Sequence, residues 1–340
     1  MCFYQHHPYD EHCGPMHWGH MTSKDLIRWQ HQPVALAPGD AFDRDGCFSG
    51  CAINDGGTLT LIYTGHTWLK DAGNDSAIRQ VQCIATSEDG IHFTKHGVVA
   101  IPPDGIMHFR DPKVWKQEGR WFMVVGARDE NDVGQVLLYS GTSLYAWQFS
   151  GVLAKADKHL GYMWECPDFF PLGDKNLLMF SPQGVAPDGY HYRNRFQSGY
   201  MLGRWQPDHP FTLTQHFKEL DAGHDFYASQ SFMAADGRRL IFGWMGMWES
   251  DIPTQTEGWA GCLTLPRELS LNAQGQVRMT PIRELEALRK EHHSISPFTL
   301  KNQRRRLGIS AQHTELIITL DVANSHAERY GIEIAVSDDG

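Results

Sequence analysis

The sequence Phe-Ser-Gly-Cys-Ala-Ile at residues 48–53, a Gly-Gly turn at residues 56–57 and Leu-Thr-Leu-Ile-Tyr at residues 59–63 together predict a β-hairpin. Apolar, β-prone residues stand on both sides of a polar turn that contains glycine, which is the usual signature of a hairpin. The same layout occurs three more times, around the turn glycines Gly119, Gly173 and Gly237. From Gly57 these glycines advance by 62, 54 and 64 residues, so the chain is built from a long repeat.

A second pattern recurs in phase with the hairpins. A polar turn is followed seven residues later by an aromatic side chain at residues 22–29, at residues 86–93 and, more loosely, at residues 140–147. Such a segment closes one four-stranded unit and starts the next. Because radial repetition of four-stranded units protects strand edges, the two patterns predict an all-β fold with a β-propeller.

Two acidic residues stand at matching places in the repeat. Asp111 precedes Gly119 by eight residues, and Glu165 precedes Gly173 by eight. The first strand of each propeller blade lines the central channel, so both carboxylates are expected at one mouth of that channel. The same offset brings Phe48 or Ser49, and Ser229 with Tyr227 just upstream, to this mouth. The gathering predicts an active site.

The two acids have different neighbours along the chain. Glu165 follows Trp164, and a carboxyl group among apolar neighbours is desolvated, which suits it to donate a proton near neutral pH. Asp111 follows Arg110, and a carboxylate beside an arginine stays ionised. Carboxylates in contrasting environments are typical of acid and base roles in glycoside hydrolysis. A structural alternative is an Arg-Asp turn with a glutamate salt-bridged in the core.

Five motifs occur in a fixed order: Phe-Tyr-Gln-His-His-Pro at residues 3–8, Gly-Pro-Met-His-Trp-Gly-His at 14–20, Phe-Ser-Gly at 48–50, Arg-Asp-Pro at 110–112 and Trp-Glu-Cys-Pro at 164–167. Together they resemble glycoside hydrolase family 32, and within it the bacterial sucrose and sucrose-6-phosphate hydrolases (invertases). The resemblance covers essentially the whole chain. It implies a five-bladed β-propeller followed by a β-sandwich.

The resemblance also implies roles for individual residues in a retaining double displacement at the anomeric carbon of fructose. Glu165 matches the general acid/base, and Asp111 matches the transition-state stabiliser that holds fructose hydroxyls, with Arg110 orienting the carboxylate of Asp111. The remaining matches are the sugar-binding positions Gln5, Trp18, Phe48 and Ser49. Tyr227 and Trp244 are further candidates for the wall of the same pocket.

One motif of the family has no counterpart in this sequence. The nucleophile is the aspartate of Asn-Asp-Pro-Asn-Gly ahead of the Phe-Tyr-Gln run, and no aspartate here matches it. Without a nucleophile a retaining glycosidase cannot form its covalent intermediate. We therefore expect a piece of a longer protein whose first blade lacks its inner strand. The alternative to a fructosidase is a sugar-binding propeller without catalysis.

The domain boundary is expected near Pro281. Residues 1–280 hold the repeats and form the propeller. Residues 282–290 space their apolar side chains three apart, as a short amphipathic helix does, and strand-like patterning resumes from Val322. Residues 281–340 are thus expected to be a linker helix and the start of the C-terminal β-sandwich.

The composition of the chain limits the classes of binding partner that we expect. A net charge of −10 disfavours nucleic acid and anionic membranes, and no apolar run has the length of a transmembrane helix. Seven cysteines without framework spacing indicate reduced thiols and a cytoplasmic location. The histidine cluster between His6 and His20 matches no zinc pattern, so neither a metal nor a cofactor is expected. The expected partner is a small sugar. Sucrose, sucrose-6-phosphate and short fructans stay open as substrates, as do hydrolysis and fructosyl transfer.

Overall fold

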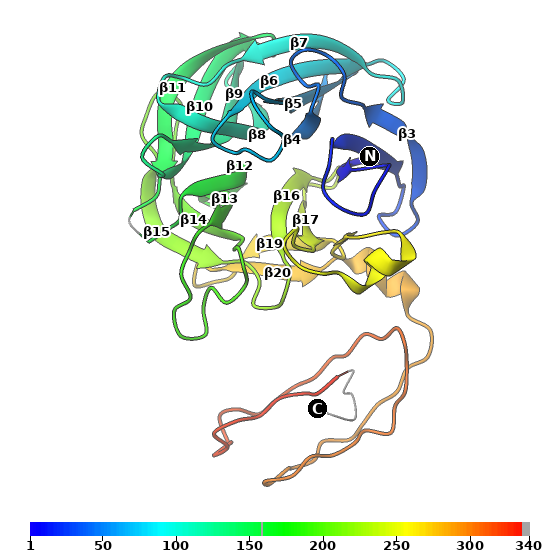
Figure 1. The fold of residues 1–340 in the computed structure, drawn as a ribbon. Helices are drawn as coiled ribbons and strands as arrows, with labels where there is room; N and C mark the ends of the chain where they lie inside the picture. The colour runs from blue at the N-terminus through cyan, green and yellow to red at the C-terminus, as the bar shows by residue number, and fades with distance from the viewer. Residues whose placement is uncertain (158, 335–340) are drawn as a thin grey trace. The chain divides into compact units, whose positions relative to one another are not determined.

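The computed structural model describes residues 1–157 and 159–334 (Figure 1). The chain separates into two compact units, Met1–Glu284 and Leu285–Gly340. Within the described residues, all strands belong to the first unit.

The first unit consists of antiparallel sheets that follow one another along the chain. The first sheet is β1-β2-β3: Cys2–His6, His17–Thr22 and Gln30–Leu36. The second is β4-β5-β6-β7: Gly46–Asp55, Thr58–Trp68, Ile78–Ser87 and Thr94–Ala100. The third is β8-β9-β10-β11: Ile106–Gln117, Arg120–Asp129, Gly134–Ser143 and Ala146–Lys155.

The fourth sheet is β12-β13-β14-β15: Met163–Leu172, Lys175–Gln183, Gly199–Arg204 and Thr212–Glu219. The fifth is β16-β17-β19-β20: Tyr227–Met233, Arg239–Met245, Arg267–Leu271 and Val277–Pro281. A short strand, β18 (Cys262–Leu263), pairs with β17 in the same sheet. These sheets stand around a common centre as the blades of a propeller (Figure 1). The described residues thus confirm the expected all-β, five-bladed propeller.

The four predicted hairpins are the first two strands of blades two to five. They correspond to β4–β5, β8–β9, β12–β13 and β16–β17. The turn glycines Gly57, Gly119, Gly173 and Gly237 have φ angles of 107°, 79°, 62° and 86°. A side chain at such angles is strained, which is why glycine marks the repeat so clearly.

The second sequence pattern is the connection that leads into the last strand of a blade. Ahead of β3, the Asp25 carboxylate accepts the backbone N–H groups of Ile27 and Arg28 at 3.0 and 2.8 Å. Ahead of β7, the Asp89 carboxylate accepts those of Ile91 and His92, both at 2.8 Å. A short acidic side chain that caps its own turn explains why the two segments share a sequence.

Apolar side chains fill the space between neighbouring blades. Trp115, Phe122 and Phe169 pack with Trp205 between blades three and four, with ring centroids 5.3 to 5.8 Å apart. The first strands of adjacent blades also contact each other, β4 with β8, β8 with β12 and β12 with β16. This packing fixes the ends of four strands against one another, and these ends carry the residues discussed below.

The second unit contains no regular element over the described residues 289–334. A 3₁₀ helix, η2 (Arg283–Leu288), stands where a linker helix was expected, and a further 3₁₀ helix, η1, spans Pro253–Glu257. The strand expected from Val322 is not formed up to Ile334, and residues 335–340 lie outside the described part. A strand needs a partner for its backbone N–H and C=O groups. The β-sandwich therefore stays a prediction.

No helix in the described part of the chain is long and apolar enough to cross a lipid bilayer. The seven cysteines all lie within the described residues and are all free thiols.

Candidate active site

The first strand of blades two to five is interrupted by a β-bulge near its start. The bulges follow Phe48 on β4, Arg110 on β8, Glu165 on β12 and Tyr227 on β16. A bulge adds one residue to a strand and redirects the side chains around it. These four residues are structurally equivalent, and all four are predicted site residues.

Three of the bulges hold a residue other than glycine at positive φ. The angles are 67° at Asp111, 50° at Cys166 and 50° at Ala228. Such residues are uncommon outside glycine and cost free energy, so surrounding contacts must hold them in place. The bulge therefore recurs at the same place in the first strand of these blades.

Contacts between blades fix Asp111. Its carboxylate oxygen Oδ2 accepts the backbone N–H of Cys166 at 2.9 Å, and the Cys166 thiol lies 3.6 Å from the same oxygen. Its own backbone N–H donates to the Thr64 hydroxyl at 3.0 Å. Asp111 therefore joins blades two, three and four, and only 6% of its surface is exposed.

Burial changes the acidity of Asp111. Desolvation, together with the negative charge of Glu165, raises the pKa of this carboxyl group from its usual 3.8 to about 6, although Arg110 and the hydrogen bonds from Cys166 oppose the shift. Asp111 consequently takes up a proton as the pH falls through about 6.

Glu165 meets three hydrogen-bond donors. Arg110 donates from Nε and Nη2 to Oε1 at 2.8 and 2.7 Å. The Gln183 amide donates to Oε2 at 2.9 Å, and the Tyr227 hydroxyl donates to the same oxygen. The carboxylate is thus held by side chains from three consecutive blades, and 15% of the side chain is exposed.

The expected apolar environment of Glu165 is wrong, because successive side chains of a strand point to opposite faces. Trp164 is fully buried on the other side, where it stacks on Phe180 with ring centroids 4.0 Å apart. Its indole N–H donates to the Leu160 carbonyl at 2.8 Å. Trp164 therefore belongs to the core, on the face of β12 opposite to Glu165.

The expected role of Arg110 also requires correction. Arg110 was expected to orient Asp111, its neighbour in sequence, but its guanidinium group binds Glu165 on the next blade. The bulge turns consecutive residues in different directions, so neighbours along the chain are separated. The structural alternative of a salt-bridged glutamate is correct as geometry, and the bridge lies inside the cluster of site residues.

A network that the sequence analysis missed holds Arg110. Its Nη1 donates to Nδ1 of His108 at 2.8 Å and to the side-chain oxygen of Gln80 at 3.4 Å. That Gln80 oxygen also accepts the backbone N–H of Phe109 at 2.9 Å. Burial and the charge of Arg110 lower the pKa of His108 to about 3, so the imidazole is neutral and can accept. The position of His108 two residues before Arg110 was the available signal.

The remaining predicted residues divide into those that surround Phe48 and those near Glu165. Phe48 stacks on His66 with centroids 4.3 Å apart and an interplanar angle of 8°, and Ser49 is the bulge residue beside it. The Gln5 amide donates to the Cys47 carbonyl at 3.1 Å, and the Trp18 indole donates to the Phe48 carbonyl at 3.1 Å.

Trp18 differs from its expected place on the sugar-binding surface. Only 3% of it is exposed, and its ring packs in the core against Phe3 and Tyr63. The indole N–H of Trp18 holds the backbone carbonyl of Phe48 from the core side of the sheet. The pattern Gly-Pro-Met-His-Trp identifies this residue but does not tell which face of β2 it occupies.

An aromatic wall adjoins Glu165. Tyr227, whose hydroxyl binds the carboxylate, is paired across the sheet with Trp244. The ring of Trp244 lies parallel to that of Trp248, with centroids 6.4 Å apart and an interplanar angle of 6°. Trp248 is the exposed member of this wall, and the repeat gave no sign of it because it follows β17 in a loop.

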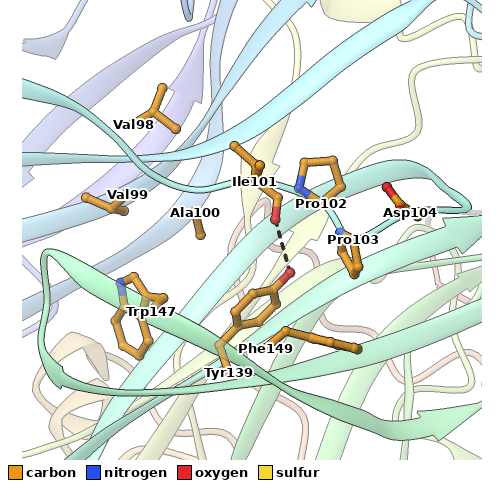
Figure 2. A pocket seen from close by; sticks show the side chains of 10 residues that line it. All are labelled: Val98, Val99, Ala100, Ile101, Pro102, Pro103, Asp104, Tyr139, Trp147 and Phe149. Carbon is orange, nitrogen blue, oxygen red and sulfur yellow. Dashed lines mark hydrogen bonds between the residues drawn. The ribbon is translucent and has the colours of Figure 1, made fainter.

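Two other features lie apart from this cluster. A pocket of about 590 Å³ lies between the outermost strands of blades two and three, with Tyr139, Trp147 and Phe149 on one side of it (Figure 2). Asp104 is the sole carboxylate in its lining, so it offers no acid pair. Among the described residues, exposed Asp10, Glu11 and His12 form a group with metal-ligand spacing, and His12 already bonds Asp10 at 2.8 Å.

Several known proteins are similar to this chain in sequence and in fold. Residues 1–281 match the family model described as the glycosyl hydrolases family 32 N-terminal domain. A sucrose-6-phosphate hydrolase of Escherichia coli is 60% identical over 98% of this chain and 69% of its own length. A raffinose invertase of Escherichia coli is 57% identical over the same shares of the two chains.

Solved structures give the same result. A family 32 β-fructofuranosidase of Bombyx mori, in complex with sucrose, superposes with a TM-score of 0.79 at 42% identity over 85% of this chain. Sucrose-6-phosphate hydrolase of Lactobacillus gasseri gives 0.77 at 31% identity over the same share. The chain spans 61% of the Bombyx structure and 59% of the Lactobacillus structure.

Proposed function

Because this chain belongs to glycoside hydrolase family 32, we propose that it is a β-fructofuranosidase that acts on the bond between fructose and glucose in sucrose or sucrose-6-phosphate. One observation carries the proposal: Asp111 and Glu165 meet across adjacent blades, linked by Arg110 and by the Cys166 backbone. Paired carboxylates with different environments are the machinery of glycoside hydrolysis.

In this proposal Asp111 holds the fructosyl group. Above pH 6 its carboxylate is ionised and can accept hydrogen bonds from sugar hydroxyls. Its negative charge would also stabilise the positive charge that develops on the ring in the oxocarbenium-like transition state. Because Asp111 is buried and fixed by Cys166 and Thr64, it needs little rearrangement to do so.

Glu165 is the proposed proton donor to the oxygen of the leaving sugar. Arg110, Gln183 and Tyr227 would set the direction of its carboxyl group, because each donates to one of its two oxygens. The same group would later take a proton from the attacking water, as the double displacement requires.

The double displacement also needs a carboxylate nucleophile. The resemblance assigns that group to the Asn-Asp-Pro-Asn-Gly motif, which the 340 residues do not contain. We therefore propose that these residues supply fructose binding and the proton donor, and that turnover requires the motif. The seven free thiols favour a reducing compartment, and we place the protein in the cytoplasm.

Binding and turnover test the proposal separately. Calorimetry of the 340-residue chain should detect fructose but not glucose, and Asp111→Asn should abolish fructose binding. In the chain extended by a segment that supplies Asn-Asp-Pro-Asn-Gly, Glu165→Gln should lower sucrose turnover by about 10²- to 10⁴-fold. It should spare a fructosyl donor whose leaving group needs no proton. Fructose binding that survives Asp111→Asn, or equal turnover of both donors, would refute these assignments.

A further inference from the structure

The exposed indole of Trp248 contacts Tyr227, which in turn binds the proposed proton donor. Its ring meets that of Tyr227 edge-on, with centroids 5.4 Å apart, and the Tyr227 hydroxyl binds Glu165. Tyr227 is 1% exposed, whereas Trp248 is 41% exposed. One buried aromatic ring therefore separates the carboxylate from a free aromatic surface.

The turn that carries Trp248 is held in place on both sides. Met247 is 1% exposed in a small core with Phe196 and Tyr227. Trp248 itself stacks on Phe196 with centroids 5.0 Å apart at 25°. The backbone N–H of Ser250 closes the turn on the Met247 carbonyl at 3.0 Å.

A surface ion pair and a second tryptophan complete this support. Glu249, the next residue, pairs with Arg195, whose guanidinium group lies 5.2 Å from the Phe196 ring. Trp244 lies parallel to Trp248 on the sheet side. Gly246 and Gly261 let the backbone approach the Trp244 ring, because a Cβ there would lie 2.6 and 2.8 Å from its atoms. The indole of Trp248 is thus preorganised without a ligand.

Exposure increases along the line from Asp111 to Trp248. Asp111 is 6% exposed, the Glu165 side chain 15% and Trp248 41%. A proton donor stands beside the oxygen that joins the two sugars, so the fructosyl group lies on its buried side and the leaving sugar on its open side. An aromatic ring on the open side offers an apolar face to the C–H groups of a hexose.

We propose that Trp248 is a specificity-determining residue that binds the leaving hexose by stacking. The inference rests on the proposed function, since it assigns the open side of the same site. Trp248 binds the second sugar and contributes nothing to the binding of free fructose. The preference of this site for fructosides with a hexose leaving group therefore originates in the loop after β17.

The test measures the affinity of the 340-residue chain for sucrose and for fructose by calorimetry. Trp248→Ala should lower the affinity for sucrose by about three- to tenfold and leave the affinity for fructose unchanged. Trp248→Phe retains an aromatic face and should recover most of the loss. Trp259→Ala is the matched control, because Trp259 is similarly exposed at 46% and takes part in none of the ring contacts described around Tyr227.

Equal losses for sucrose and fructose would overturn the inference, because Trp248 would then contact the fructosyl group. Unchanged sucrose affinity in Trp248→Ala would overturn it as well. Wild-type protein that binds fructose but gains nothing from the second sugar refutes the stacking role and leaves the proposed function standing. Wild-type protein that binds neither sugar refutes both.

Discussion

The bulges on β8 and β12 look alike in sequence but give their acids different hydrogen-bond partners and different degrees of burial. Each contains an acid followed within two residues by proline, and each has a residue at positive φ. On β8 the acid occupies the strained position, and Asp111 is buried. On β12 Cys166 occupies that position, and Glu165 precedes it at the place that Arg110 takes on β8.

This difference shows that the adjoining blade, and not the neighbouring residue in sequence, determines the environment of each acid. Arg110 and Glu165 are equivalent in the repeat and pair with each other across the blades. Asp111 and Cys166 are equivalent too, and they also bond each other. Each pair joins equivalent positions in the first strands of consecutive blades, so the four residues form two links between blades three and four.

The largest effect is expected from breaking the Arg110–Glu165 link. Arg110→Leu leaves Glu165 charged, partly buried and close to Asp111, which should lower the free energy of unfolding by about 3–5 kcal/mol. Urea denaturation measures this loss. Arg120→Leu is the control, because Arg120 and Asp208 form a surface pair with side chains 38% and 73% exposed. That pair should contribute about 0–1 kcal/mol, and equal losses in the two variants would contradict the contrast.

The second prediction concerns the pH dependence of the Asp111 link. The pKa of Asp111 is raised in the folded protein, so between about pH 4 and 6 the folded state binds more protons than the unfolded state. Ionised Asp111 therefore costs stability above pH 6. Relative to Asp111→Asn, the wild type should lose about 2 kcal/mol of unfolding free energy between pH 4 and pH 7.

Urea denaturation of both proteins at the two pH values measures this effect, since groups that do not interact with Asp111 cancel in the difference. Asp208→Asn is the control of opposite sign, because Arg120 lowers the pKa of Asp208. A difference between wild type and Asp111→Asn that stays constant with pH would show that Asp111 has an ordinary pKa.

A smaller effect is expected one contact away from the Glu165 link. His108→Leu removes the acceptor of Arg110 Nη1 and should cost about 1–3 kcal/mol, because a buried charged donor loses its partner. His108→Asn places a side-chain oxygen near the position of Nδ1 and should restore most of this loss. Thermal or urea unfolding distinguishes the two, and equal losses would mean that His108 acts only by filling space.

The smallest effect is expected for Tyr227→Phe. This change removes one donor from Glu165 Oε2, which keeps the Gln183 amide, while Arg110 stays on Oε1. The loss should be about 1 kcal/mol in urea denaturation. A loss as large as that of Arg110→Leu would show that the hydroxyl, and not the guanidinium group, holds the acid.

The repeat predicted the fold well because hairpin signals are local. Alternating apolar residues around Gly57, Gly119, Gly173 and Gly237 fix both the strands and their order. The same count from the glycines also predicted that Asp111 and Glu165 lie near each other, and the structure links them through Arg110 and Cys166.

The equal offset of eight residues from the turn glycines nevertheless pairs Asp111 with Glu165, and this alignment is wrong by one residue. Gly119 is the second residue of its two-residue turn, after Glu118, whereas Gly173 is the first of its turn. The true equivalents are Arg110 with Glu165, which a count from the glycines cannot detect. Contacts of Glu165 with Arg110 and Tyr227 depend on three blades, and no pattern within one blade encodes them.

The most direct test of the contrast is a carbon-13 NMR titration of the aspartate carboxyl groups, with Asp111 assigned from the spectrum of Asp111→Asn. Asp111 should titrate at a pKa of about 6, because it is buried beside Glu165 while Arg110 is bound to the glutamate. If Arg110 instead paired with its neighbour in sequence, Asp111 would titrate below its usual 3.8. That result would contradict the pairing across blades on which the proposed site depends.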